Sequence, residues 1–202
     1  MNKQAEIERR TFLKKSGLCA ATIALLGSRE AIAADDTDQI KRLKSIKTYL
    51  IERHAVMHEI LSVTLRPEVL EEVYQKFGRD CASCYGAVRK TEAYKGNLEE
   101  YLQEVPSLDK WQEEASLDKE KNLITITGTK REECVCSMAR ASKNPDWCKL
   151  CCAGYQKAVF ENLLGKEVEV TMGETVLLGG ERCNHFIKIS EKEIQSKKQV
   201  GY

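Results

Sequence analysis

Residues 151–165 read CCAGYQKAVFENLLG, and this stretch decides the fold that we expect. Its apolar positions recur at intervals of three and four residues, the spacing of one face of an α-helix: Cys152, Tyr155, Val159 and Leu163. Gly165 can end this helix, because glycine readily adopts the left-handed backbone conformation that follows many helices. A helix with one apolar face has to pack against another surface, so the neighbouring segments must supply it.

The segments around this helix predict strands. Residues 122–128 read NLITITG and alternate between β-branched apolar and polar side chains, which is typical of a strand with one buried face. Three further strands are expected at residues 167–171, 175–178 and 183–189. Gly179 and Gly180 predict a hairpin between the last two, because glycine tolerates the positive φ of tight turns. We therefore expect a small antiparallel sheet with one helix packed on it.

Helices are expected before the sheet. From residue 37 to about residue 64, one helical stripe recurs at every third or fourth position: Leu43, Ile46, Leu50, His54, Met57 and Leu61. A second helix is expected from Pro67, a favoured first-turn residue, to about Gly78, and a short one near residues 98–102. The fold class is therefore α+β, with one domain over residues 34–202 that is mainly helical in residues 34–121 and holds the sheet in residues 122–190.

The composition limits the possible functions. A chain of 202 residues with 42% hydrophobic residues can bury one core and carry an appendage. The 32 basic and 31 acidic residues give a net charge of +1, so we expect no nucleic-acid partner, because such proteins carry a clear cationic excess. Only three prolines and twelve glycines exclude a collagen-like or low-complexity chain.

The first 33 residues predict a secretory signal. Residues 9–15, RRTFLKK, precede an apolar stretch at residues 17–26 and a small-x-small ending, Ala31-Ile32-Ala33. The order of residues 9–14 resembles a bacterial twin-arginine signal, which implies the twin-arginine translocase as export partner, a periplasmic or other extracytoplasmic location, and export of a folded chain. The alternative is a membrane anchor, but a span needs about 20 apolar residues. We therefore expect no stable membrane span in the mature chain, from which Cys19 is removed.

Eight of the nine cysteines follow residue 33, and their spacing points to metal binding. Cys81-x-x-Cys84 and Cys148-x-x-Cys151 each allow two thiolates from one turn to reach the same ion. The economical hypothesis is a four-sulfur site made of Cys134, Cys136, Cys148 and Cys151. Cys81 and Cys84 then either replace the Cys134 pair or form a second site. Zinc and an iron–sulfur cluster both suit such ligands as the cofactor.

A disulfide framework is the main alternative, because an exported chain meets an oxidising compartment and eight is an even number. We favour metal over disulfides on geometric grounds. A Cys-x-Cys pair and the vicinal pair Cys151-Cys152 make poor local disulfides, although each cysteine can still pair over a longer range.

Histidines supply the remaining candidate chemistry. His54 and His58 are four residues apart, a spacing at which two imidazoles can bind one ion, but packing of His54 on the helical stripe is the favoured interpretation. Cys183 and His185 alternate along the last strand and would face the same side of the sheet. They are our candidates for a ligand pair or for a catalytic thiolate with its base. Sheet packing is the alternative for them as well.

The second half of the chain resembles the 4-vinyl reductase domain superfamily and the related L-2-amino-thiazoline-4-carboxylate hydrolase family. The resemblance rests on Cys148-x-x-Cys151-Cys152-Ala153-Gly154-Tyr155, on Gly165, and on residues 179–189, GGERCNHFIKI. It implies a small α+β domain that holds a small organic ligand beside a cysteine-rich, often zinc-binding, edge. Cys152 and Cys183 match cysteines of the family, whereas residues 172–178 offer only Glu174 where sensor members carry further zinc ligands.

Three functions follow from these patterns. The first is an exported, cysteine-ligated metalloprotein with a pocket for a small molecule; as an enzyme, it would be a hydrolase that opens a thiazoline ring, with Cys183 and His185 as nucleophile and base. The second is a periplasmic electron-transfer protein with an iron–sulfur cluster. The third is a binding module held together by disulfides without metal.

Overall fold

The computed structural model describes residues 37–142, 144 and 147–193, so the predicted signal lies outside the described residues. The chain divides after Thr48 into two compact units. In the described residues the first unit consists of the opening turns of helix α2, Thr37–Thr64. The site and the cavities belong to the second unit, which begins at Tyr49. None of the described helices has the length and apolarity that a membrane span requires.

The predicted helices are present, although two of them extend further than expected. Helix α3, Pro67–Cys84, begins at the predicted proline and is followed by α4 (Ala87–Thr91), a short 3-10 turn η1 (Glu92–Tyr94) and α5 (Leu98–Leu108). The stripe predicted for α2 is at most half-buried, and Leu50 is 48% exposed. The buried residues of α2 are instead Ala55 and His58, which the predicted stripe did not include. The expected end of α3 at Gly78 is wrong, since the helix continues through Cys81 to Cys84.

Gly78 lies where α3 crosses α7, Cys152–Leu164. A Cβ atom built on Gly78 would overlap the carbonyl oxygen of Cys151 and lie 2.6 Å from the backbone nitrogen of Tyr155. A Cβ atom built on Gly154 of α7 would lie 2.6 Å from the Cα atom of Gln75 in α3. Glycine therefore serves here to let two helix backbones touch, and it does not mark a turn.

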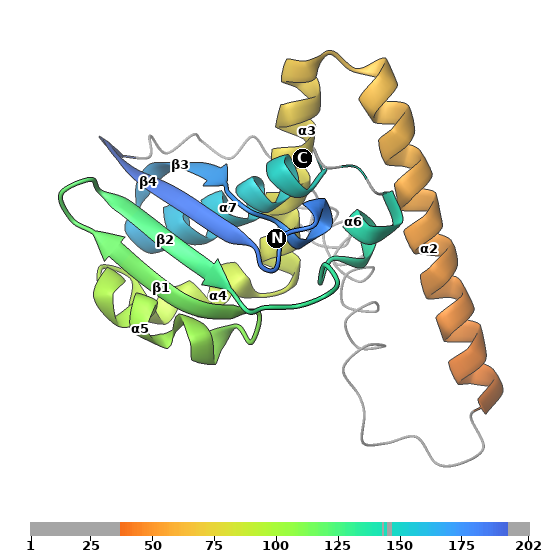
Figure 1. Cartoon of the computed structure of the whole chain (residues 1–202), viewed down its shortest axis with the longest axis horizontal. Helices are drawn as coiled ribbons and strands as arrows, with labels where there is room; N and C mark the ends of the chain where they lie inside the picture. Colours follow the sequence, from red (N-terminus) through yellow and green to blue (C-terminus); the bar gives the residue numbers. More distant parts are fainter. Residues whose placement is uncertain (1–36, 143, 145–146, 194–202) are drawn as a thin grey trace, which may run out of the picture. The chain divides into compact units, whose positions relative to one another are not determined.

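The sheet has four strands in the order β1-β2-β4-β3, and all neighbours are antiparallel (Figure 1). The strands are β1 (Gln112–Asp118), β2 (Leu123–Gly128), β3 (Lys166–Met172) and β4 (Asn184–Glu193). The sequence patterns did not predict β1, because its residues QEEASLD are mostly polar and the strand lies at the edge of the sheet. The α+β fold class is confirmed.

The connection between β3 and β4 differs from the expected hairpin. Residues 175–178 were expected to form a strand, but Val176–Leu178 form the 3-10 turn η3, and β3 pairs directly with β4. Gly179 closes this turn with a φ of +90°, which is the conformational role predicted for it. The turn leaves Cys183 in the connection, immediately before β4.

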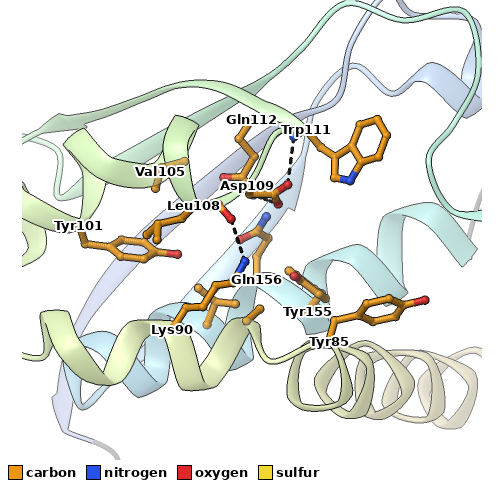
Figure 2. A pocket seen from close by; sticks show the side chains of 12 residues that line it. Tyr85, Lys90, Tyr101, Val105, Leu108, Asp109, Trp111, Gln112, Tyr155 and Gln156 are labelled. Atoms are coloured by element: carbon orange, nitrogen blue, oxygen red, sulfur yellow. Dashed lines mark hydrogen bonds between the residues drawn. The ribbon is translucent and has the colours of Figure 1, made fainter. Parts of the chain in front are cut away.

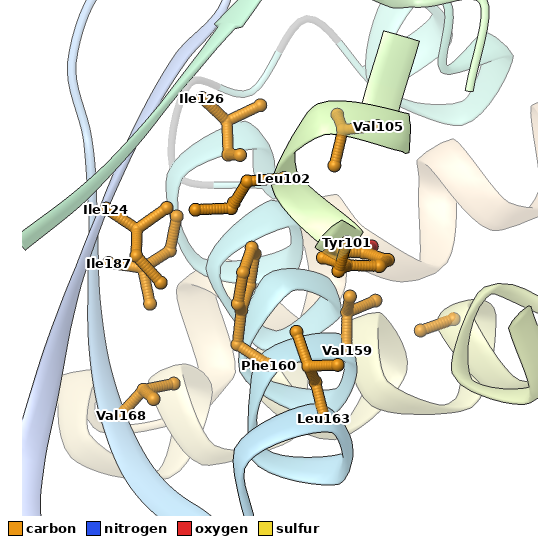
Figure 3. Close-up of a cluster of buried hydrophobic side chains, with 11 residues drawn as sticks. Tyr101, Leu102, Val105, Ile124, Ile126, Val159, Phe160, Leu163, Val168 and Ile187 are labelled. Carbon is orange, nitrogen blue, oxygen red and sulfur yellow. The ribbon is translucent and has the colours of Figure 1, made fainter. Parts of the chain in front are cut away.

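The main core lies between the sheet and the helices α5 and α7 (Figure 3). Phe160, Val159 and Leu163 of α7 pack toward isoleucines from the central strands, including Ile124 and Ile187. Leu102 and Val105 of α5 close the core beside β1 and β2. The helix that was predicted from residues 151–164 therefore packs across the sheet as expected, and Gly165 ends it with a φ of +66°.

A second cluster of buried side chains adjoins α3 and consists largely of rings and sulfur atoms. It includes Leu70, Tyr74, Cys134, Ala139, Trp147 and Cys151. Trp147–Cys151 form a π-helical turn, η2, that leads into α7, and a short helix α6 (Ser137–Ser142) comes before it. Three of the cysteines, Cys134, Cys136 and Cys151, lie in this cluster or pack against it.

The helix crossing can be tested by whether one substitution raises or lowers the free energy of unfolding. In an ordinary helix, Gly→Ala stabilises by about 1 kcal/mol, because alanine has the higher helix propensity. We expect Gly154→Ala instead to lower the free energy of unfolding by about 1–3 kcal/mol, the typical cost of overpacking. Urea denaturation followed by circular dichroism measures this change. Glu72→Ala, at an exposed position of α3, serves as control and should change stability by less than about 0.5 kcal/mol; a Gly154→Ala variant more stable than wild type would contradict the tight crossing.

Candidate functional site

The fold brings eight cysteines from distant parts of the sequence into one neighbourhood. Cys81 and Cys84 end α3, Cys134 and Cys136 lie between β2 and α6, and the remaining four lie in η2, at the start of α7 and before β4: Cys148, Cys151, Cys152 and Cys183. All eight are free thiols in the structure. Their interactions form two sets that are joined to each other, because Cys151 also interacts electrostatically with Cys148, and Cys152 also interacts with Cys151 and Cys136.

The first set, which we call the Cys148 group, consists of Cys134, Cys148, Cys152 and Cys183. The thiol of Cys134 donates a hydrogen bond to the sulfur of Cys148, and the thiol of Cys148 donates one to Cys152. Cys183 interacts electrostatically with Cys134 and Cys148. Cys148 and Cys152 are four residues apart in a continuous helical segment, which places them on one face.

The second set, the Cys81 group, consists of Cys81, Cys84, Cys136 and Cys151. Cys81 interacts electrostatically with Cys84 and Cys136, and Cys151 interacts with Cys81 and Cys136. The helix crossing explains this arrangement, because Gly78, which touches the backbone of Cys151, lies one turn before Cys81. The backbone N–H of Ala139 donates to the sulfur of Cys136 at 3.5 Å.

Burial helps to keep several of these thiols protonated, Cys81, Cys148 and Cys151 among them. It raises the pKa of Cys81 to about 11 and also raises the pKa of Cys151, and neighbouring sulfur atoms add to both shifts. For Cys148, the hydrogen bond from Cys134 lowers the pKa, but the hydrogen bond to Cys152 and burial outweigh it, so the pKa is raised. Protonated thiols are weak nucleophiles, so these groups become reactive or ligating only after they lose a proton.

The four-sulfur set predicted from spacing has members in both groups, which are linked by the interaction of Cys148 with Cys151. Cys134 and Cys148 belong to the Cys148 group, whereas Cys136 and Cys151 lie with Cys81 and Cys84. Within the described residues, no three histidine, cysteine, aspartate or glutamate side chains are already arranged to hold one metal ion. The structure therefore supplies neighbouring thiols, and a metal site made from them remains a prediction.

Cys183 and His185 have separate partners. Nε2 of Gln156 lies 3.2 Å from Nδ1 of His185, which is in β4, while the sulfur of Cys183 accepts a hydrogen bond from the backbone N–H of Val176. Burial, and to a lesser extent Arg131, lowers the pKa of His185 to about 4. Burial also raises the pKa of the Cys183 thiol. The predicted catalytic pair would need both side chains to exchange these partners, and the assignment stays a prediction.

His58 is a residue whose environment the sequence patterns missed. Its side chain is completely buried, and its ring centroid lies 3.6 Å from that of Trp147 and 5.2 Å from that of Tyr74. Neither ring nitrogen has a hydrogen-bond partner among the described residues. Burial, with a smaller effect of His54, lowers the pKa of His58 to about 4. His58 lies three residues before Leu61 of the predicted stripe. The helical spacing could therefore have placed His58 on the same face of the helix as Leu61.

A cavity of about 200 Å³ lies next to the cysteines (Figure 2). It opens between α4, α5 and the start of β1, with α7 as its floor, and its polar lining includes Tyr85, Lys90, Tyr101, Asp109, Tyr155 and Gln156. Nζ of Lys90 donates to the carbonyl oxygen of Leu108 at 2.8 Å across this space. Burial raises the pKa of the Tyr101 and Tyr155 hydroxyls, so both remain protonated hydrogen-bond donors.

Two side chains of the lining also interact with cysteines. Tyr85 interacts electrostatically with Cys81, Cys136 and Cys84, and Tyr155 interacts with Cys81 and Cys152. Gln156 faces the cavity and contacts His185, two residues after Cys183. Tyr85 and Tyr155 therefore form a shared wall between the cavity and the thiols.

No protein-family model matches this sequence, and no curated protein matches it either. Among solved structures, the chain is similar to trafficking protein particle complex subunit 3 from Naegleria fowleri, covalently bound to palmitic acid, with 11% identity over 73% of this chain and 99% of that chain and a TM-score of 0.44.

It is also similar to the phenol-responsive sensory domain of the transcription activator PoxR with phenol (14% identity, 69% of this chain, 74% of that chain, TM-score 0.45). A third similar structure is a vinyl-4-reductase family protein from Methanocaldococcus jannaschii (14% identity, 81% and 85%, TM-score 0.33). The third structure belongs to the family that residues 148–189 resemble. All three TM-scores lie below 0.5, and we take the function from the residues of this chain alone.

The two buried histidines predict a pH dependence of stability. Below pH 6.5 the unfolded chain binds protons at His58 and His185, whereas the folded chain does not until about pH 4. The free energy of unfolding must therefore fall as the pH is lowered from 6.5 to 4, by about 3 kcal/mol at most for His58. We expect His58→Leu to remove part of this slope in urea denaturation series between pH 7 and pH 4. The His58→Leu/His185→Leu double variant should remove more, and a slope unchanged by both substitutions would contradict neutral burial.

Proposed function

We propose that this chain is a metal–thiolate protein that binds a small molecule in the cavity beside its metal-binding thiols. The observation that supports this most strongly is the convergence of eight thiols from α3, the β2–α6 connection, the η2–α7 segment and the β3–β4 connection. Ordinary core packing does not require so many sulfur atoms in one place. Clusters of thiols with Cys-x-x-Cys spacing are the usual ligands of zinc.

Metal binding would compensate the negative charge that the buried sulfur atoms carry once they have lost their protons. A thiol that ligates a metal ion gives up its proton, and the positive ion then compensates the buried negative sulfur. The raised pKa of the thiols means that this exchange releases protons at neutral pH. The affinity for metal should consequently increase with pH.

A single ion suits the packing better than a cluster. Zinc needs no space of its own beyond four sulfur atoms at about 2.3 Å, whereas an iron–sulfur cluster adds several atoms between its ligands. Neither the 200 Å³ cavity nor the wider hollow of about 880 Å³ over Arg79 and Asn162 is lined by a cysteine. We therefore propose zinc, and electron transfer through an iron–sulfur cluster is the alternative that absorption spectra distinguish.

The cavity favours a small, largely uncharged organic ligand. Its lining presents protonated hydroxyls, two amides and apolar side chains. The ammonium group of Lys90 donates to the Leu108 carbonyl, and the carboxylate of Asp109 accepts from the backbone N–H of Trp111 and from the Gln112 amide. Hydrolysis of such a ligand, as in the thiazoline hydrolase family, would need a thiolate at Cys183. The raised pKa of that thiol makes ligand binding the simpler function.

We further propose that the protein acts outside the cytoplasm. The support is the twin-arginine pattern at residues 9–14. A chain that already holds its metal before export would also have its thiols protected from oxidation in the new compartment.

The metal proposal predicts the result of elemental analysis. Full-length protein purified without oxygen and without added metal should be colourless and contain zinc, and the thiols that bind the zinc should react with a thiol reagent only after a chelator is added. Visible absorption with bound iron would instead indicate a cluster. Absence of metal together with blocked thiols that only a reductant releases would overturn the proposal in favour of a disulfide framework. Cys19→Ser removes the ninth thiol and should leave the metal content unchanged.

The export proposal predicts the effect of a conservative substitution. Replacing Arg9 and Arg10 by lysine keeps the charge but removes the pair that the translocase recognises. We expect the variant to accumulate as precursor in the cytoplasm of a bacterial host, as judged by fractionation, while a Lys14→Arg/Lys15→Arg control is exported. Equal export of both variants would count against the twin-arginine route.

A further inference from the structure

We infer that the exposed face of helix α2 pairs with the same face of a second copy of this chain, and that the two helices run antiparallel. The inference concerns residues 49–63, the part of α2 that belongs to the second unit. It is independent of metal binding, because none of the eight thiols lies on α2.

Helix α2 carries apolar side chains on two opposite faces. One face packs against the rest of the second unit through Ala55 and His58, which are buried, and the ring of His58 lies against Trp147 of η2. The residues two positions before and after His58 lie about 200° around the helix from it, on the side away from that contact. This opposite side presents large apolar side chains to solvent: Tyr49, Val56, Ile60 and Val63, which are 54%, 47%, 56% and 85% exposed.

The spacing of the exposed face is that of a helix pair. Its seam, at intervals of four, three, four and three residues, consists of Tyr49, Arg53, Val56, Ile60 and Val63. Intervals of this kind have a mean period of about 3.5 residues, which is the repeat along which two helices pack in a coiled coil. A helix that faced only water on this side would carry charged and polar side chains there.

The seam is complementary to itself, which a twofold dimer requires, because the same surface then forms both sides of the interface. In an antiparallel pair with the twofold axis between residues 54 and 55, Arg53 of one copy faces Val56 of the second copy. Tyr49 of one copy then faces Ile60 of the second copy. Large and smaller side chains therefore alternate across the interface, as in other closely packed helix pairs.

Arg53 determines the direction of pairing. Its Nε donates to the hydroxyl oxygen of Tyr49 at 3.1 Å, and its guanidinium carbon lies 5.3 Å from the centre of that ring, so its side chain extends along the seam. In a parallel pair the two Arg53 side chains would face each other and repel. In the antiparallel pair each Arg53 faces Val56, which Glu52 and Glu59 flank by one turn on either side. Each guanidinium group then meets carboxylates of the second copy.

Pairing would also provide the packing that α2 lacks in the single chain. Between residues 49 and 63, only Ala55 and His58 are buried. An isolated helix of about 12–15 residues is only marginally stable in water, so most helices depend on packing of an apolar face. A second helix covers the side that the rest of the chain leaves open. Because two helices of about four turns form a small interface, we expect the dimer to dissociate in the micromolar range.

Sedimentation velocity of the full chain tests the pairing, with a reductant present so that no disulfide joins two copies. Between about 1 and 200 μM, the wild type should change from monomer to dimer. Val56→Glu and Ile60→Glu each place a carboxylate in the seam and should raise the dissociation constant by about 100-fold or more. Leu178→Glu is the matched control, because Leu178 is 52% exposed and lies in η3, and this variant should dimerise like the wild type.

Photo-crosslinking tests the direction of the two helices. The photoreactive amino acid p-benzoylphenylalanine in place of Tyr49 keeps an aromatic side chain in the seam. After irradiation, the crosslinked dimer should contain a bond from position 49 to the peptide that includes Ile60 of the second copy, as identified by mass spectrometry. A bond to the peptide that includes position 49 of the second copy would indicate a parallel pair and overturn the antiparallel arrangement.

The remaining outcomes also decide the inference. A wild type that stays monomeric at every concentration would overturn it, and so would a dimer that persists in both Val56→Glu and Ile60→Glu. A monomeric wild type that binds vesicles of anionic lipid, with binding lost in Ile60→Glu, would assign the exposed face to a membrane surface instead. Circular dichroism should show both variants folded, because each substitution is at an exposed position; if either fails to fold, the wild-type sedimentation and the crosslink still decide.

Discussion

The close crossing of α3 and α7 is the constraint on which the second unit depends. Gly78 and Gly154 allow the two backbones to touch, and no larger residue fits at either position without displacing a helix. The crossing fixes the end of α3 beside the start of α7, so it determines where Cys81 and Cys151 meet. The same placement of α7 directs Phe160 and Leu163 into the core under the sheet. One contact between backbones thus positions both the thiols and the main core.

The region around the thiols is packed differently from the main core. The main core consists of aliphatic and aromatic side chains from strands and helices, whereas the second cluster contains sulfur atoms and rings, with His58 against Trp147. Several polar atoms there are buried without partners in the described residues, including both nitrogens of His58 and Nε1 of Trp147. Each such atom costs about 1–3 kcal/mol, and costs of this kind accumulate mainly where a site needs them.

Local patterns in the sequence predicted those parts of the fold that local physics determines. The alternation in residues 122–128 gave β2, and Gly165 and Pro67 marked the limits of α7 and α3. Gly78 was misinterpreted, because its role depends on a helix that lies more than 70 residues away in the sequence. The edge strand β1 was missed because its exposed residues carry no apolar period. Spacing identified the cysteines that cluster but could not group them, because the grouping is set by the helix crossing.

The shared wall between cavity and thiols has a thermodynamic consequence. Tyr155 and Gln156 follow Cys151 and Cys152 by one turn of α7, so a displacement of this turn moves both sets of side chains. A molecule that shifts the tyrosine on entering the cavity would thereby change the affinity of the sulfur atoms for the ion that we propose they bind. Reciprocity then requires the ion to change the affinity for that molecule by the same factor. In such a protein, the amount of bound metal and the affinity for an organic ligand would depend on each other.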